Sequence, residues 1–141
     1  MKISEVLDKI GNIPYLAISG DCTLNEATEK IADMRQTRSI YVTDKQGRLQ
    51  GTLSLGVLIR EVIAARHKPQ FGVRSLLTYI TSEDVADIMN KHIIHAQIDD
   101  DLEEVLKRMI HYNIKEIPVV DEDQRIIANI SILDLWRLVE R

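Results

Sequence analysis

The chain has 141 residues, of which 45% are apolar and 28% charged, enough to bury the core of an ordinary globular domain. The formal net charge is −4 with no long run of one sign, which argues against a dedicated nucleic-acid surface because phosphate binding needs clustered Lys and Arg. Cys22 is the only cysteine, so an intrachain disulfide is excluded and a reducing, cytoplasmic compartment is expected. No apolar run approaches the ~20 residues that span a bilayer, so we expect no membrane insertion.

The chain opens with a predicted helix and a short strand. Apolar residues recur at helical spacing over residues 3–10, with Ser4 as the expected N-cap and Gly11 as the stop. Residues 13–18 are a strand candidate with Pro14 near its edge.

A second helix and a hairpin follow. Thr23 and Glu26 form a capping-box pattern ahead of apolar residues at helical spacing. Residues 39–43 and 49–53 predict two strands joined across residues 45–48.

A third helix is predicted over residues 55–66, and Pro and Gly in the polar stretch that follows indicate a linker at residues 67–73. Beyond the linker, Ser82 and residues 85–89 are expected to begin a helix. A strand over residues 92–98 and a helix over residues 100–111 come next.

The last part of the chain is the most informative. Residues 116–120 are mostly β-branched and bounded by charges, which favours a buried strand over a helix. Residues 121–124 supply a turn, residues 125–132 a second strand and residues 133–139 an apolar-rich helix.

This strand–turn–strand pattern occurs twice, and the period counted from Ile40 to Ile117 is 77 residues. A repeat of this length is a whole small unit of helices and strands, so the chain has two copies rather than a solenoid array. The matching segments are residues 40–44 with 117–121, 45–48 with 122–125, and 49–54 with 126–131.

Each copy resembles a CBS motif, the module first described in cystathionine β-synthase, and the tandem resembles a Bateman module. The segments of copy two that carry the resemblance are residues 84–89, 100–105, 117–121 and 131–134. The resemblance implies an α+β fold of two βαββα-like motifs, packed sheet to sheet with pseudo-twofold symmetry. The expected boundaries are residues 1–66 for the first motif, 67–73 for the linker and 74–141 for the second motif.

Ser131 and Asp134 are the main site candidates. A hydroxyl and a carboxylate three residues apart at a strand-to-helix junction lie on one side of the first helical turn. The carboxylate can accept two hydrogen bonds from a ribose diol, and the hydroxyl and helix amides can meet a phosphate. The alternative is a helix cap followed by an acid that the helix dipole favours.

The resemblance implies that adenine occupies an apolar slot between the first strand of a copy and its Ile-Pro-Val strand. In copy two this slot consists of Ile93, Ile94, His95, Ala96, Ile117, Pro118 and Val119. His95 either touches base or phosphate or is a surface or packing histidine. Lys115 either screens phosphate charge or is a solvated lysine.

Copy one departs from the pattern. Val57 stands where copy two has Asp134, and a valine cannot hold a ribose diol, so the first site is empty, altered or specific for another ligand. Tyr41 replaces Pro118 and either stacks on a base or fills space. The family glycine is kept as Gly51 but is Ala128 in copy two, where we expect its methyl group to narrow a ligand's approach. Arg38 occupies the place of Lys115.

Catalytic sites are not indicated, so we expect a protein that is not an enzyme and has no resident cofactor. Cys22 lies beside a predicted helix start, where a lowered thiol pKa or an ordinary thiol are the two interpretations. Asp99, Asp100 and Asp101 are either Mg²⁺ or Ca²⁺ ligands or a solvated helix start.

The predicted function is a cytoplasmic sensor that binds AMP, ADP or ATP in the cleft between the two motifs and relays occupancy by a conformational or dimer rearrangement. One alternative is a nucleotide-independent docking module that regulates a partner transporter or enzyme. Another is a Mg²⁺-responsive module. A homodimer through the helices is expected, with Leu58, Val62, Leu135 and Leu138 as contact candidates.

Overall fold

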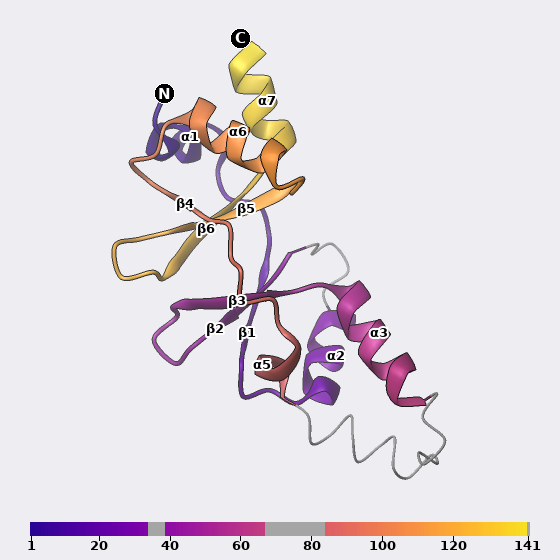
Figure 1. Ribbon diagram of the computed structural model, residues 1–141. Coiled ribbons are helices and arrows are strands. Elements are labelled where there is room, and N and C mark those ends of the chain that lie inside the picture. The colour runs from indigo at the N-terminus through magenta and orange to yellow at the C-terminus, as the bar shows by residue number, and fades with distance from the viewer. Residues whose placement is uncertain (34–38, 67–83, 141) are drawn as a thin grey trace. The chain divides into compact units, whose positions relative to one another are not determined.

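The computed structural model describes residues 1–33, 39–66 and 84–140, so the linker predicted at residues 67–73 lies outside the described residues, as does Arg38. Helices and strands follow the repeat (Figure 1). In chain order they are α1 (Ile3–Ile10), β1 (Leu16–Ser19), α2 (Leu24–Ala32), β2 (Ile40–Thr43), β3 (Leu49–Leu53), α3 (Leu55–Arg66), α5 (Val85–Ile88), β4 (Ala96–Gln97), α6 (Leu102–His111), β5 (Glu116–Val120), β6 (Ile126–Ser131) and α7 (Ile132–Glu140).

The strands form two three-stranded sheets with the orders β1-β2-β3 and β4-β5-β6. In each sheet the first two strands are parallel, and β5 and β6 are antiparallel neighbours in the hairpin that the sequence predicts. This arrangement confirms the α+β class. Two strands are shorter than predicted: β1 begins at Leu16, and β4 contains only Ala96 and Gln97 of the predicted residues 92–98.

The chain divides into two compact units. Unit 1 consists of Met1–Pro14, Gln46–Leu49 and Ile94–Arg141, and unit 2 of Tyr15–Lys45 and Gln50–Ile93. Unit 1 therefore combines the sheet of copy two with the leading helix α1, while unit 2 combines the sheet of copy one with the leading helix α5. Each copy gives its first helix to the unit that holds the other copy's sheet.

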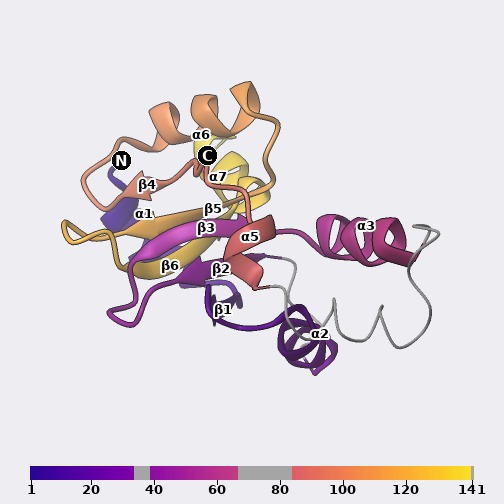
Figure 2. The same ribbon diagram turned by 60° about the horizontal axis from the view of Figure 1, so that its bottom comes forward.

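Unit 1 buries one face of its sheet beneath α1, α6 and α7, as Figures 1 and 2 show from two directions. The strand side chains that face these helices alternate with residues on the opposite face, as the two-residue period of a strand requires. The fully buried members of this core include Ile3, Val6, Val105, Met109, Ile117, Val119, Ile130 and Leu135.

Backbone hydrogen bonds hold α1 to the loop before α6. The N–H groups of Ile3 and Ser4 donate to the carbonyls of Asp100 and Ile98, both at 2.9 Å. These distant carbonyls satisfy helix donors that would otherwise need a cap. The prediction of Ser4 as the N-cap is therefore wrong: the N-cap is Lys2, without a side-chain cap bond. The predicted stop at Gly11 is confirmed, with φ of 73°.

The leading helix of unit 2 is fastened in the same way. The N–H groups of Val85 and Ala86 donate to the carbonyls of Cys22 and Gly20, at 2.8 and 3.0 Å. The core of this unit consists of Ile18, Cys22, Leu24, Ala27, Ile40, Val42, Leu53, Leu58 and Val85. Thr23 is the N-cap of α2, because its hydroxyl accepts from the Glu26 N–H; this confirms the Thr23 half of the predicted capping box.

Two of the predicted dimer contacts are wrong. Leu58 is 2% exposed and Leu135 is 0% exposed, so both side chains belong to the cores of their own units. Leu138 is only partly buried, against the core of unit 1, and the side chain of Val62 lies outside the described part of the chain.

Candidate functional site

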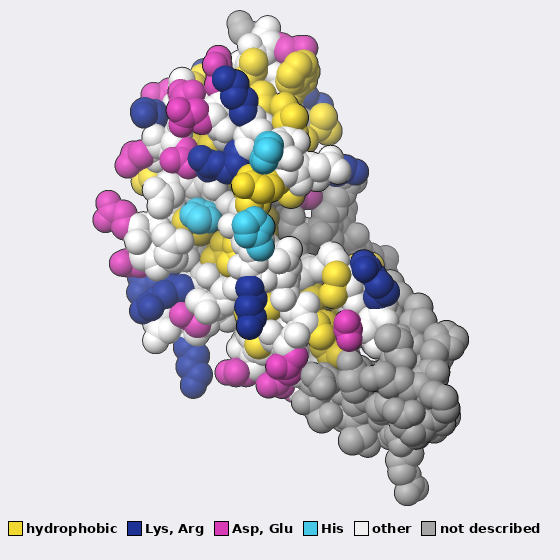
Figure 3. All heavy atoms as spheres, viewed as in Figure 1, with side chains coloured by type: hydrophobic (Ala, Val, Ile, Leu, Met, Phe, Trp, Pro, Cys, Tyr) yellow, Lys and Arg dark blue, Asp and Glu magenta, His cyan; other side chains and the backbone are white. Residues whose placement is uncertain are grey.

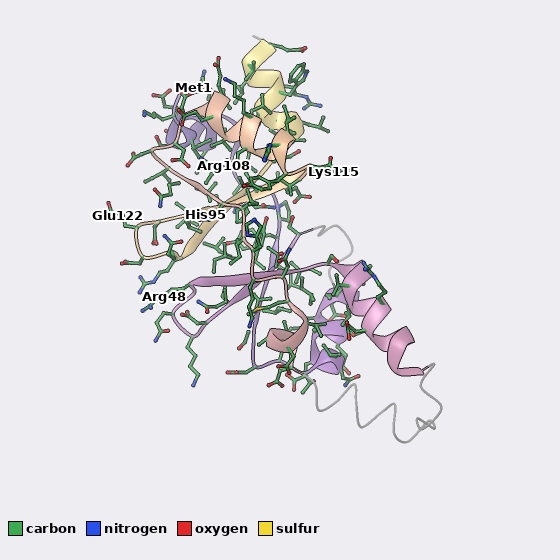
Figure 4. The ribbon with its side chains drawn as sticks, in the orientation of Figure 1. Met1, Arg48, His95, Arg108, Lys115 and Glu122 are labelled. Carbon is green, nitrogen blue, oxygen red and sulfur yellow. The ribbon has the colours of Figure 1, made fainter. Side chains whose placement is uncertain are left out.

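The junction between β6 and α7 brings together three of the predicted site residues. Ser131 pairs with Glu116 across the β5–β6 ladder, and the Ile132 N–H donates to the Lys115 carbonyl at 2.8 Å. Lys115 therefore lies beside the start of α7, while Glu122 is at the other end of the hairpin (Figure 4). The Lys115 side chain is exposed.

Ser131 serves as a helix cap. Its Oγ accepts a hydrogen bond from the Leu133 N–H at 3.2 Å, which satisfies one of the donors that a helix leaves free at its start. The hydroxyl proton is not used by this contact, so Ser131 can still donate to an anionic oxygen. The capping role and the ligand role are therefore compatible.

Asp134 lies in the first turn of α7 and is half-buried. Within the described parts of the chain its carboxylate has no hydrogen-bond or ion-pair partner. Other acids of unit 1 differ in this respect: Asp121 accepts from the N–H groups of Asp123 and Arg125, and Asp100 accepts from the Gln97 N–H. Both oxygens of Asp134 are thus available to a ligand that offers two donors.

Pro118 explains why β4 is short. In unit 2, the ladder of β1 and β2 begins at Leu16↔Ile40, where the Leu16 N–H donates to the Ser39 carbonyl at 3.1 Å. In unit 1 the ladder of β4 and β5 begins only at Ala96↔Val119. Proline has no N–H with which to extend the ladder backwards. The segment before Ala96 therefore leaves the sheet next to Pro118.

Arg108 holds this detached segment. Its guanidinium Nη1 donates to the His95 carbonyl at 2.7 Å and to Asp100 Oδ2 at 3.2 Å. Figure 4 shows Arg108 on α6 and His95 below it, in the segment just before β4. Sequence reasoning missed Arg108, because 13 residues separate it from His95 and no motif marks it.

The predicted slot residues divide between two faces of the sheet. Ala96, Ile117 and Val119 belong to the core beneath the helices, so a ligand could meet only their backbone. Pro118 is buried but outside that core cluster, on the opposite face. Ile94 and His95 are half-buried, and Ile94 also packs against the core. The side chains left to line a site here are those of Pro118, His95 and in part Ile94.

Asn129 is a buried polar residue that the sequence pattern did not single out. It is 0% exposed and its Nδ2 donates to Glu116 Oε1 at 2.8 Å. Its backbone N–H donates to Asn12 Oδ1 at 2.7 Å, and its carbonyl accepts from the Ile13 N–H. Asn129 therefore fastens the segment after α1 to the edge of β6. The only sequence signal for this residue is its position between two core residues of an alternating strand.

The family glycine has a packing role in copy one. A Cβ at Gly51 would lie 2.6 Å from Met89 Sδ and 2.9 Å from the Asn90 carbonyl, so the approach of this segment requires glycine. In unit 1 the methyl group of Ala128 is part of the core. It faces away from Pro118, which corrects the expectation that it narrows a ligand's approach.

Two of the three consecutive aspartates have structural partners. Asp100 accepts from Gln97 and Arg108, and Asp101 is the N-cap of α6 and accepts from the Glu103 N–H. A hollow of about 310 Å³ beside Asp99 is lined by Gln97, Ile98, Asp99, Val120, Asp121, Glu122 and Asp123. Among the described residues no group of three or more His, Cys, Asp or Glu is placed to hold a metal ion.

The family model for the CBS domain matches residues 3–64 and 85–135. The chain belongs to the CBS domain family. The match falls on both copies of the repeat, so the two copies form a tandem CBS pair, in agreement with the resemblance inferred from the sequence.

Known relatives of this CBS pair include parts of transporters. The chain is 30% identical over 130 residues to the magnesium transporter MgtE of Thermus thermophilus, covering 89% of the chain and 25% of the transporter. A solved structure of the cytosolic domain of the Mg²⁺ channel MgtE in complex with ATP matches with a TM-score of 0.64 and 30% identity, over 88% of the chain and 44% of that domain.

A solved CBS domain-containing protein from Thermotoga maritima matches along its length, with a TM-score of 0.70 and 26% identity over 99% of the chain and 94% of that protein. The CBS pair thus spans about a quarter of the transporter, whereas its extent is close to that of the Thermotoga protein. Within residues 1–33, 39–66 and 84–140, no helix is long and apolar enough to cross a membrane.

Proposed function

We propose that this CBS pair is a non-catalytic sensor module that binds an adenine nucleotide, AMP, ADP or ATP, at the β6–α7 junction of unit 1. The observation that carries the proposal is the Asp134 carboxylate, which lies half-buried at the start of α7 without a partner in the described parts of the chain. A ribose diol supplies two donors to such a group. The ATP complex of the related cytosolic domain of MgtE supports an adenine nucleotide as the ligand class.

Each part of the ligand has a chemical counterpart in unit 1. The Ser131 hydroxyl and the exposed Lys115 ammonium are suited to phosphate oxygens. The base would lie near Pro118 and the His95 segment, where the β4–β5 ladder is interrupted. No described residue of this junction forms the nucleophile–base pair that a hydrolase would need, which favours sensing over catalysis.

Calorimetric titration with AMP, ADP and ATP tests this assignment. Replacing Asp134 with Asn keeps the shape of the side chain but removes the charge that favours the diol. The loss of a hydrogen bond to a charged group, about 1.5–3 kcal/mol, predicts affinity about 10- to 150-fold weaker. Asp123→Asn is the matched control, because Asp123 is an exposed acid on the hairpin turn and should leave affinity unchanged. Equal affinities of Asp134→Asn and the unaltered chain would exclude the assignment.

The regulated partner is proposed to be a transporter, because the identity of 30% to MgtE extends over most of the chain. Nucleotide occupancy can act on such a partner only if two shapes of the module differ in their affinity for the ligand. We also propose a cytosolic location and a homodimer. A Mg²⁺-responsive role at Asp99, Asp100 and Asp101 has less support, since Asp100 and Asp101 already have partners within unit 1.

A further inference from the structure

The place in unit 2 that corresponds to the proposed site differs from it at two decisive positions. With the 77-residue period, Tyr41 of β2 corresponds to Pro118 of β5, and Val57 of α3 corresponds to Asp134 of α7. The two units can therefore be compared position by position, each within its own sheet.

Tyr41 fills space at this place. Its neighbours Ile40 and Val42 belong to the core of unit 2, whereas Tyr41 is outside that cluster, on the same side of the strand as Pro118 in unit 1. Tyr41 is buried, as Pro118 is, but its larger side chain places a ring on this face, 5.6 Å from the ring of Tyr15 with a tilt of 56°. Such a pair is a favourable aromatic contact, so the ring is fixed and not held open for a base.

The backbone hydrogen bonds of β1 and β2 are also continuous beside Tyr41. Tyr41 has the N–H that Pro118 lacks, and β1 pairs with β2 over four residues, from Leu16↔Ile40 to Ser19↔Thr43. The corresponding ladder of unit 1 has two pairs. In unit 1 the segment before Ala96 leaves the sheet beside Pro118. The corresponding segment of unit 2 therefore stays within the sheet beside Tyr41.

The helix start of unit 2 also lacks the group that would hold a sugar. The first turn of α3 has no acidic residue. Ser54 Oγ accepts from the Val57 N–H at 3.1 Å, which is the ordinary contact of a helix cap. Val57 offers neither a donor nor an acceptor to a diol.

We propose that unit 2 is closed to nucleotides by Tyr41 and Val57, so that the CBS pair binds one adenine nucleotide per chain, in unit 1. This inference rests on the proposed function. Tyr41 excludes the base in two ways, by placing its ring on that face of β2 and by completing the β1–β2 ladder. Val57 removes the carboxylate that would hold the ribose. Pro118 and Asp134 are thus the residues that determine which unit binds.

Calorimetric stoichiometry with AMP, ADP and ATP tests the proposal on the full chain. We expect one equivalent per chain, with affinity about 10- to 150-fold weaker in Asp134→Asn. Two equivalents, or one equivalent that Asp134→Asn binds with unchanged affinity, would overturn this inference while leaving adenine nucleotide binding intact. An absence of binding by the unaltered chain would overturn the proposed function, and this inference with it.

Exchanging the two residues between the units tests whether Tyr41 and Val57 are what prevents nucleotide binding in unit 2. Tyr41→Pro combined with Val57→Asp should add a second equivalent, and a folded double variant that still binds one equivalent would contradict the proposal. Because Tyr41 is buried, this variant is paired with Pro118→Tyr, which should abolish binding in unit 1. Circular dichroism should show an unchanged helix content in Pro118→Tyr, so that a loss of nucleotide binding can be assigned to the site and not to unfolding. Retained nucleotide binding in that variant would also overturn the proposal.

Discussion

At the scale of single residues, the proposed site depends on two hydrogen-bonding positions that the fold leaves unused, one in the backbone and one on a side chain. Pro118 removes one donor from the sheet, and the strand beside it shortens accordingly. Asp134 is an acid without a described partner in a unit where Asp100, Asp101 and Asp121 all have one. A gap in a ladder and an unused carboxylate are each ordinary, but their occurrence together in unit 1 is what the proposed site rests on.

The first prediction at this scale concerns Arg108. Replacing it with Met releases the His95 carbonyl, so the segment beside Pro118 gains freedom that nucleotide binding must then remove. The variant also loses the hydrogen bond to Asp100 Oδ2, but the bond to His95 is the one that holds the segment beside Pro118. Its loss, about 1 kcal/mol, predicts affinity roughly fivefold weaker by calorimetry. Lys107→Met is the control, because it removes the same charge from an exposed position of α6. An equal loss in both variants would attribute the effect to charge and not to the His95 contact.

At the scale of elements, α7 presents different faces to the core and to solvent. Leu135 is fully buried, whereas Leu133, Trp136 and Val139 are 63%, 48% and 38% exposed. Hydrophobic side chains gather over this helix in Figure 3. Large exposed apolar patches are uncommon on monomers and often mark interaction surfaces. This stripe replaces the buried leucines as the candidate surface for the proposed homodimer.

Trp136 allows a direct test of that surface. Trp136→Glu places a charge in the middle of the stripe without touching the core, so we expect a monomer where the unaltered chain is a dimer. Sedimentation equilibrium at several concentrations measures this change in mass. Arg137→Glu, at an exposed polar position on the same helix, should remain dimeric. A dimer that survives Trp136→Glu would place the interface elsewhere.

The sequence predicted the helices and strands better than it predicted the contacts between them. The hairpin β5–β6 was predicted because β-branched runs and a polar turn are local signals. The Ser4 cap was predicted wrongly because the donors of α1 are satisfied by Asp100 and Ile98, about a hundred residues away. The length of β4 depended on a missing N–H in another strand. Leu135 was placed in an interface because a helical pattern does not reveal which apolar face meets the chain's own sheet.

The site itself was predictable to a similar degree. Ser131 and Asp134 are candidates from their spacing together with the CBS resemblance, and the structure brings Lys115 to the same junction. Arg108 and Asn129 were missed because each acts through a backbone group that is distant in the chain. The slot residues Ile117 and Val119 were included as side chains, although alternation along β5 directs them into the core.

At the scale of the whole molecule, each unit is built from both copies of the repeat. The core of unit 1 contains Ile3 and Val6 from α1, and Asn12 holds the following segment to β6. Neither copy contains a complete core by itself, although the repeat suggests two independent halves. Cutting the chain at the linker would therefore separate each sheet from a helix that covers it.

Fragment complementation tests this construction. A polypeptide of residues 84–140 lacks α1, so we expect it to show little cooperative unfolding by circular dichroism. Adding a peptide of residues 1–14 should restore a cooperative transition, because it supplies Ile3, Val6 and the Asn12 contact. The same peptide with Ile3→Ala and Val6→Ala is the control and should restore much less, since each truncation of a buried side chain costs about 1–4 kcal/mol. A stable transition without any peptide would show that the second copy folds alone.

The exchange of leading helices also sets the order in which a ribosome can complete the fold. The apolar face of α1 leaves the exit tunnel long before β5 and β6 are synthesised, and at about 5–20 residues per second the wait lasts on the order of ten seconds. During that interval Ile3 and Val6 have no strand to cover, which makes this stretch a natural substrate for chaperones that bind short apolar segments. Nascent chains halted before Glu116 should therefore capture such a chaperone, and full-length chains followed by a tether that spans the exit tunnel should release it.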